Sequence, residues 1–235
     1  MTNSANINAN NNKGPLAIMG GAFDPVHYGH LRSAVEIQEQ LQLDELRFVP
    51  SANPPHRDPH VATAALRVRM LEAALADMPG CTLDQRELNR DGPSWSVVTL
   101  KEIRAEIGSR SLCMILGMDA FLGLPGWHRW EELLEFAHIV VAFRPGSRPP
   151  ETGVLGDLLV KCGTRNPTDL HAAAAGKLML LEVTQLEISS TTIRACLTSG
   201  GSAQHLLPDA VLDIIKDSAC YTENTSLPQE RGLHG

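Results

Sequence analysis

The sequence has 235 residues, of which 43% are hydrophobic and 20% charged, and its formal net charge is -7 with a pI near 5.7. This length suits one large α/β domain with a substantial core and is short for two ordinary domains, while the acidic balance argues against a general nucleic-acid binder. No stretch approaches the ~20 apolar residues that a membrane-spanning helix needs. The five cysteines are scattered without a CxxC pair, which favours a reducing cytoplasm.

The two ends of the chain differ in composition from the middle. Residues 1–14 are rich in Asn and lack the basic flank and apolar stretch of a secretory signal, so we expect a disordered polar extension. Residues 222–235 are also polar and are expected to form a loose tail. One domain, residues 15–221, remains between them.

Within this domain, short apolar runs alternate with segments of helical periodicity, which predicts a single α/β domain with a doubly wound, mostly parallel sheet. Ligands of such sheets bind beyond the C-terminal ends of the strands. Residues 147–175, rich in Pro, Gly and Ala, are expected to be an irregular excursion. Strands are predicted over residues 16–20, 46–50, 81–84, 112–117, 139–143 and 178–183. Helices are predicted over residues 30–41, 63–78, 96–107, 130–136, 191–197 and 209–217.

The first strand runs directly into GGAFDPVHYGH, residues 20–30. Gly20 and Gly21 allow a tight turn and close approach of a ligand, and the start of the following helix forms an anion site. His27 and His30 are three apart and share one face of the first helical turn, so both can donate hydrogen bonds to a polyphosphate. The alternatives are an ordinary turn with surface histidines, or a zinc pair, which is less favoured because helical zinc pairs are usually spaced i, i+4.

Polar side chains follow the second and third strands. The proline-rich loop PSANPPHR ends in Arg57, which either reaches a phosphate or belongs to a rigid connector. Ser94 and Ser96 precede a predicted helix, where a hydroxyl either caps the helix or faces a ligand.

Further candidates follow the fourth and fifth strands. Asp119 suits ribose hydroxyls or a metal-bound phosphate, although capping the next helix would also satisfy it. Trp127 lies beside Pro and Gly as a platform for a flat heteroaromatic ring, whereas Trp130 fits the core. Arg144 is a cation at the end of the fifth strand.

A second phosphate motif, ISSTTIR, occupies residues 188–194. Its hydroxyl residues are good caps for a short helix, and capping alone explains the serines. The free backbone N–H groups of the helix start, together with Arg194 one turn in, form a second anion cradle.

The two motifs, GGxFDPxHxGH and ISSTxxR, resemble those of the nucleotidyltransferase superfamily with a His-x-Gly-His motif on a Rossmann-like fold. The segments between and after them, FVPxxxPPHR, DxRELxRxGxSWS, GxDAFxxLxxWxxxxxL, VVAFRPG and LLPDAVLDIIKDSACY, resemble bacterial nicotinate-nucleotide adenylyltransferase. The resemblance covers residues 16–221. It implies that ATP and nicotinate mononucleotide react, with Mg2+, to give nicotinate adenine dinucleotide and pyrophosphate in NAD biosynthesis, by direct in-line attack on the α-phosphate.

The resemblance also implies roles for individual residues. His27, His30 and Arg194 would be catalytic, Trp127 would stack on the pyridine ring, and Ser96 with the backbone N–H of His128 would meet its carboxylate. ATP would be held by Gly20, Gly21, Phe23, His27, His30, Ser189, Ser190, Thr191, Ile193 and Arg194. The mononucleotide would be held by Arg57, Ser96, Asp119, Trp127, His128 and Arg144, and no residue is assigned to a resident metal.

This chain departs from the family pattern at three places. Ala22 stands where Thr or Ser is usual, Trp95-Ser96 stands where Tyr-Thr is usual, and Val98 often has a polar counterpart. Ala22 lacks one hydroxyl, while Ser96 keeps the hydroxyl and loses a methyl group.

Two alternatives stay open. One is another adenylyl- or cytidylyltransferase of the superfamily, such as the enzyme acting on phosphopantetheine, although those chains are typically shorter and lack the GxDxxxxLxxW segment. The other is a nucleotide-binding sensor without turnover, against which the intact His27, His30 and Arg194 argue. The expected partners are ATP and nicotinate mononucleotide, with no nucleic acid and no membrane, and the oligomeric state is left open, a homo-oligomer included.

Overall fold

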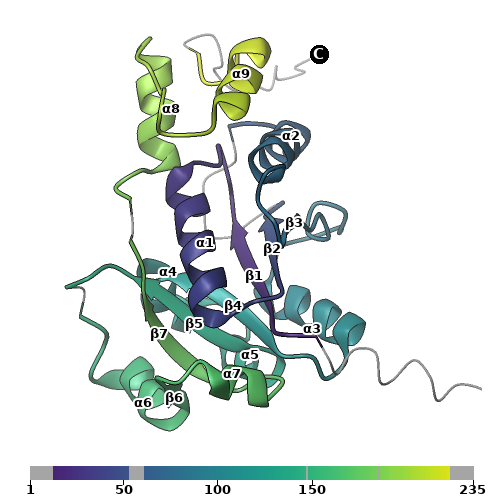
Figure 1. The fold of residues 1–235 in the computed structure, drawn as a ribbon, viewed down its shortest axis with the longest axis vertical. Coiled ribbons are helices and arrows are strands. Elements are labelled where there is room, and N and C mark those ends of the chain that lie inside the picture. The colour runs from purple at the N-terminus through teal and green to yellow at the C-terminus, as the bar shows by residue number, and fades with distance from the viewer. Residues whose placement is uncertain (1–12, 53–60, 147, 185, 223–235) are drawn as a thin grey trace, which may run out of the picture.

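The computed structural model describes residues 13–52, 61–146, 148–184 and 186–222. Within them the strands are β1 (Leu16–Gly21), β2 (Glu45–Pro50), β3 (Cys81–Leu83), β4 (Leu112–Gly117), β5 (His138–Phe143), β6 (Gly163–Thr164) and β7 (Leu178–Glu182). They form one sheet in the order β3-β2-β1-β4-β5-β7-β6, and each neighbouring pair runs parallel (Figure 1). The doubly wound fold is confirmed.

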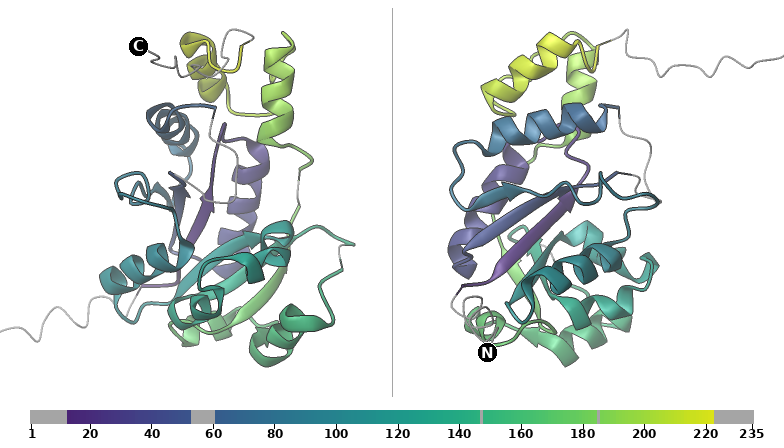
Figure 2. Two further views of the ribbon diagram at one scale, coloured as in Figure 1. Left: turned by 180° about the vertical axis from the view of Figure 1, so that it is seen from behind. Right: turned by 90° about the vertical axis from the view of Figure 1, so that its right-hand side faces the viewer.

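Helices cover both faces of this sheet. Helix α1 lies in front of it in Figure 1, and the teal helices, α3 among them, lie in front of it in the view from behind (Figure 2, left). Side chains alternate along β1, so Ala17 and Met19 join one core with α1, α2, α8 and α9, while Leu16 and Ile18 join another with α3 to α6. The helices are α1 (Tyr28–Leu41), α2 (Ala64–Leu75), α3 (Ser96–Ile107), α4 (Met118–Leu122), α5 (Leu133–Phe136), α6 (Gly153–Cys162), α7 (Thr168–Ala172), α8 (Ser190–Thr198) and α9 (Asp209–Ser218).

Most predicted elements are confirmed to within two or three residues, and the exceptions have physical causes. The expectation of an irregular segment over 147–175 is wrong, because it contains α6, β6 and α7. Leu155, Leu158, Leu159 and Cys162 share one helical face that packs on the second core, although the surrounding Pro, Gly and Ala obscure this period. The predicted helix 130–136 is divided into a 3-10 turn, Trp130–Glu132, followed by α5.

The order of the strands reverses between β1 and β4. Both strands run parallel in register, with Met19 beside Ile115, so the loops that follow them diverge at one edge of the sheet. This is the switch point at which open α/β sheets bind ligands. Among the described residues no helix is long and apolar enough to cross a membrane.

Candidate active site

Two adjoining pockets open at the C-terminal ends of β1 and β4. The larger, of about 1310 Å³, is named the histidine pocket because His27 and His30 line it. The smaller, of about 520 Å³, is named the tryptophan pocket because Trp95 and Trp127 line it. The residues that line both pockets include Gly20, Gly21, Asp119 and Trp127.

The two histidines of the first motif are held in one fixed arrangement. His27 is the N-cap of α1 and only 5% exposed, and its ring stacks on that of His30 with centroids 3.8 Å apart. The backbone N–H of His27 donates to Nδ1 of His30 at 3.4 Å, and the Phe23 ring meets His30 edge-on at 5.1 Å. A Cβ at Gly29 would lie 2.9 Å from Nδ1 of His27, so a side chain at position 29 would displace the His27 ring.

Burial keeps both imidazoles neutral at pH 7. It lowers the pKa of His27 to about 4, and burial with the neighbouring His27 lowers the pKa of His30 well below its usual value. Because Nδ1 of His30 accepts a hydrogen bond, the ring proton of His30 is on Nε2. Nδ1 of His27 is buried without a hydrogen-bond partner among the described residues. We therefore place the proton of neutral His27 on Nε2, because a proton on Nδ1 would be a buried donor without a partner. Each of the two rings then has one N–H donor, at Nε2, for a ligand.

Helix α8 brings the second motif against the first. The Ser189 hydroxyl caps α8 by accepting from the Thr192 N–H at 3.1 Å, as the simpler of the two interpretations predicts. Ser190 donates to the Pro25 carbonyl at 2.9 Å, and Arg194 donates to the Asp24 carbonyl at 2.7 Å. The two motifs, which are distant in sequence, are therefore in direct contact and together line the histidine pocket.

All but one of the residues predicted to bind ATP line the histidine pocket. Ile193 does not, because its side chain is fully buried in the core, which leaves only its backbone for a ligand. Those that line the pocket are Gly20, Gly21, Phe23, His27, His30, Ser189, Ser190, Thr191 and Arg194.

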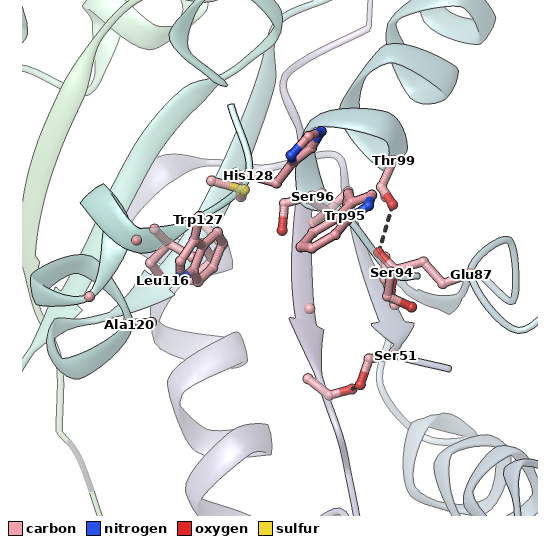
Figure 3. A pocket seen from close by; sticks show the side chains of 18 of the residues that line it. Ser51, Glu87, Ser94, Trp95, Ser96, Thr99, Leu116, Ala120, Trp127 and His128 are labelled. Atoms are coloured by element: carbon pink, nitrogen blue, oxygen red, sulfur yellow. Dashed lines mark hydrogen bonds between the residues drawn. The ribbon is translucent and has the colours of Figure 1, made fainter. Parts of the chain in front are cut away.

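Aromatic side chains line two sides of the tryptophan pocket. Figure 3 shows Trp127 and Trp95 on its two sides with the Ser96 side chain pointing between them. The Trp95 ring also lies 4.7 Å from that of His128. The Ser94 hydroxyl accepts from the Ala52 N–H at 3.0 Å. This slot fits a planar ring with hydrogen-bond acceptors at one edge.

The residues predicted to bind the mononucleotide are divided between the two pockets. Ser96, Asp119, Trp127 and His128 line the tryptophan pocket, whereas Arg144 lines the histidine pocket, where it forms an ion pair with Glu187 at 2.7 Å. Arg57 lies outside the described residues.

The capping alternatives for the polar residues after β3 and β4 are not supported by the structure. Helix α3 has Trp95 as its N-cap and α4 has Gly117, in both cases without a side-chain cap bond. The side chains of Ser94, Ser96 and Asp119 all line the tryptophan pocket instead.

Sequence reasoning missed several residues of this region. In the sequence, Trp95 was noted only as a replacement of the Tyr that is usual in the family, yet Trp95 forms one side of the tryptophan pocket. Glu87, which is buried in the wall of the pocket, accepts from the Thr99 hydroxyl at 2.6 Å. Arg67 and Tyr221 are buried and donate to the Ala22 carbonyl and the Asp24 carboxylate of the first motif. A charged residue on the apolar face of α2 was the one local signal for Arg67.

Comparisons with known proteins identify the fold and the family of this chain. A family model described as cytidylyltransferase-like matches residues 18–196. The structure of Plasmodium falciparum nicotinic acid mononucleotide adenylyltransferase complexed with NaAD is similar with a TM-score of 0.68, at 16% identity, over 88% of this chain and 97% of that chain. At this identity the likeness concerns the fold. The fold and the two pockets therefore define a nucleotidyltransferase of the cytidylyltransferase-like class.

Curated relatives give the finer assignment. A protein of Methylococcus capsulatus is 52% identical over 209 residues, 88% of this chain and 100% of that protein. A protein of Pseudomonas paraeruginosa is 48% identical over 209 residues, 88% of this chain and 96% of that protein. Both are named "Probable nicotinate-nucleotide adenylyltransferase". The chain belongs to the nicotinate-nucleotide adenylyltransferase family and is therefore an enzyme of NAD biosynthesis, which confirms the resemblance found in its motifs.

Proposed function

We propose that this chain transfers the adenylyl group of ATP to nicotinate mononucleotide, giving nicotinate adenine dinucleotide and pyrophosphate. The observation that carries the proposal is the pair of pockets that meet at Gly20, Gly21 and Asp119, one suited to a polyphosphate and one to a flat ring. The fold neighbour from Plasmodium falciparum, which is complexed with NaAD, supports the same pairing of ligands.

The histidine pocket is the proposed ATP site. Neutral His27 and His30 each donate through Nε2, and the start of α8 adds backbone donors and Arg194. Charge grows on the phosphate oxygens as pyrophosphate leaves, so donors already in place stabilise the transition state more than the ground state.

The tryptophan pocket is the proposed site of the acceptor. Trp127 stacks on the pyridine ring, and Ser96 and the backbone N–H of His128 donate to its carboxylate. Asp119 meets the ribose, and Arg144 and Arg57 hold the 5'-phosphate. A phosphate oxygen of the mononucleotide then attacks the α-phosphorus of ATP in line, without a protein nucleophile, because positioning and charge stabilisation supply most of the acceleration.

Mg2+ is proposed to enter with ATP. Among the described residues no group of three or more His, Cys, Asp or Glu could hold a metal ion. Mg2+ is commonly held by one or two carboxylates together with substrate phosphates, and the exposed Asp119 between the two pockets fits that arrangement. When bound, the ion neutralises charge on the phosphates.

A cytoplasmic location is proposed from the cysteines. All five are free, and Cys81, Cys113 and Cys220 are buried. Free thiols are typical of a reducing compartment.

The test is pyrophosphate release from ATP and Mg2+ with a panel of acceptors: nicotinate mononucleotide, nicotinamide mononucleotide and phosphopantetheine. We expect release only with a pyridine mononucleotide, and chromatography of the product should give the dinucleotide. Release with phosphopantetheine alone would replace this function by the other superfamily activity. No release with any acceptor would support a nucleotide-binding sensor.

Replacing the ring platform by Trp127→Ala is expected to raise the KM for nicotinate mononucleotide far more than the KM for ATP. Loss of stacking on an aromatic side chain costs about 1–3 kcal/mol. Trp130→Phe is the matched control, because Trp130 packs on the second core three residues further on and lines neither pocket. Equal effects of Trp127→Ala on both KM values would place Trp127 outside the ring site.

Arg194→Ala is expected to raise the KM for ATP and to lower kcat, because a guanidinium on the triphosphate acts in both ground and transition states. A hydrogen bond to a charged group contributes about 1.5–3 kcal/mol. Ser190→Ala serves as the comparison, since Ser190 also lines the pocket and donates to the Pro25 carbonyl but carries no charge, so its effect on the KM for ATP should be smaller. An unchanged KM for ATP in Arg194→Ala would restrict Arg194 to its bond with the Asp24 carbonyl.

A further inference from the structure

We propose that Asp24, Arg67 and Tyr221 are positioning residues, a buried polar network that sets the conformation of the histidine turn, which is the segment of residues 22–26 that leads into His27. The inference rests on the proposed function of that turn. None of the three belongs to the residues proposed to hold ATP or the mononucleotide.

The Asp24 carboxylate joins three segments of the chain. It is 3% exposed, and its Oδ2 accepts from the Val61 N–H at 2.8 Å. Its Oδ1 accepts from the Ala62 N–H at 3.1 Å and from the Tyr221 hydroxyl. Burial and the Asp24 charge raise the pKa of Tyr221, so its hydroxyl stays protonated and donates. The turn, the segment entering α2 and the end of the described chain are thus tied to one carboxylate.

Arg67 holds the turn from a different direction. Its side chain, 1% exposed, donates from Nη1 to the Ala22 carbonyl at 2.7 Å and from Nη2 to the Ser51 carbonyl at 2.9 Å. Ala22 follows β1 and Ser51 follows β2. One guanidinium therefore fixes the spacing of the loops that leave two adjacent strands, and a planar fork is suited to this task.

The residue between these anchors has an uncommon backbone conformation. Phe23 has φ of 49°, in the left-handed region that non-glycine residues rarely adopt unless their surroundings hold them there. Arg67 holds the carbonyl before Phe23, and Arg194 holds the carbonyl of Asp24 after it. Because the peptide group is planar, a fixed Ala22 carbonyl directs the Phe23 N–H to the opposite side.

The hydrogen bonds of Asp24, Arg67 and Tyr221 determine the positions of His27 and His30 without involving the atoms that react. Arg67 and Tyr221 do not line the histidine pocket. Asp24 does line it, but its carboxylate accepts from Val61, Ala62 and Tyr221. His27 follows the turn directly and starts α1. A small displacement of the turn would therefore move both imidazoles relative to the phosphates, and reaction rates depend steeply on such alignment.

The test compares Tyr221→Phe with Thr198→Val in the full-length chain. Both remove one hydrogen bond at the same place, because the Thr198 hydroxyl donates to the Tyr221 carbonyl at 3.1 Å. Only Tyr221→Phe removes a donor to Asp24. We expect kcat to fall about tenfold in Tyr221→Phe with the KM for ATP nearly unchanged, while Thr198→Val keeps the parent kcat. Urea unfolding of both variants reports their stability.

A purely structural role would lower the stability of both variants and leave both kcat values at the parent level, which would overturn the proposal. If Tyr221→Phe does not fold, Arg67→Lys takes its place, because Lys keeps the charge but cannot donate to the Ala22 and Ser51 carbonyls in the geometry of a guanidinium. An unchanged kcat in Arg67→Lys would likewise overturn the proposal. An inactive parent enzyme would instead reject the proposed function. The two failures are therefore distinguishable.

Discussion

Nicotinate mononucleotide is expected to be used about 10⁴-fold more efficiently than nicotinamide mononucleotide, because sites built to hydrogen-bond one substrate group discriminate on this scale. Ser96 and the His128 backbone N–H can both donate to a carboxylate, and its charge strengthens each bond. The amide replaces one acceptor oxygen with a donor, so an N–H of the pocket would face an N–H of the ligand. The measurement is the ratio of kcat/KM for the two acceptors at saturating ATP and Mg2+.

Serine variants of the tryptophan pocket test the cause of this preference. Ser96→Ala should weaken the preference without abolishing it, since a hydroxyl can rotate to accept but a backbone N–H cannot. Ser94→Ala is the matched control, because Ser94 lines the same pocket but its hydroxyl accepts from Ala52. A parent ratio near one would mean that the pocket binds the ring without recognising its carboxylate.

His30→Ala is expected to lower kcat by about 10²–10³, the scale measured for loss of one oxyanion donor, while ATP still binds. The effect falls on kcat because the Nε2–H donor matters most when charge develops on the phosphates. Steady-state kinetics and nucleotide binding by calorimetry would measure the two quantities separately.

His30 also accepts the N–H of His27, so the variant could alter the start of α1. His30→Glu separates the two roles, because a Glu side chain at this position can accept the His27 N–H and keep the helix start, but it offers no donor and repels phosphate. We expect its thermal unfolding to match that of the parent and its kcat to be no higher than that of His30→Ala. Parent-like turnover in His30→Ala would exclude His30 from the chemistry.

The site residues that could be predicted are those whose geometry is local. His27 and His30 share a face because they are three apart on a helix, and both lie at a strand-to-helix turn that Gly20 and Gly21 indicate. Ser189 and Arg194 likewise belong to one helix start. The alternation of apolar runs predicted the parallel sheet, and a sheet of this kind limits where ligands bind.

Contacts between distant segments could not be predicted in this way. Asp24 and Tyr221 are 197 positions apart, and their bond exists because α9 packs against α2 beside the histidine turn. Trp95 opposes Trp127 only because α3 and the loop after α4 flank the same pocket. Spacing along a chain determines which side chains share one turn or one helix face. Which elements then pack together depends on burial of apolar surface, which is non-directional, so the apolar pattern of one element does not identify its packing partner.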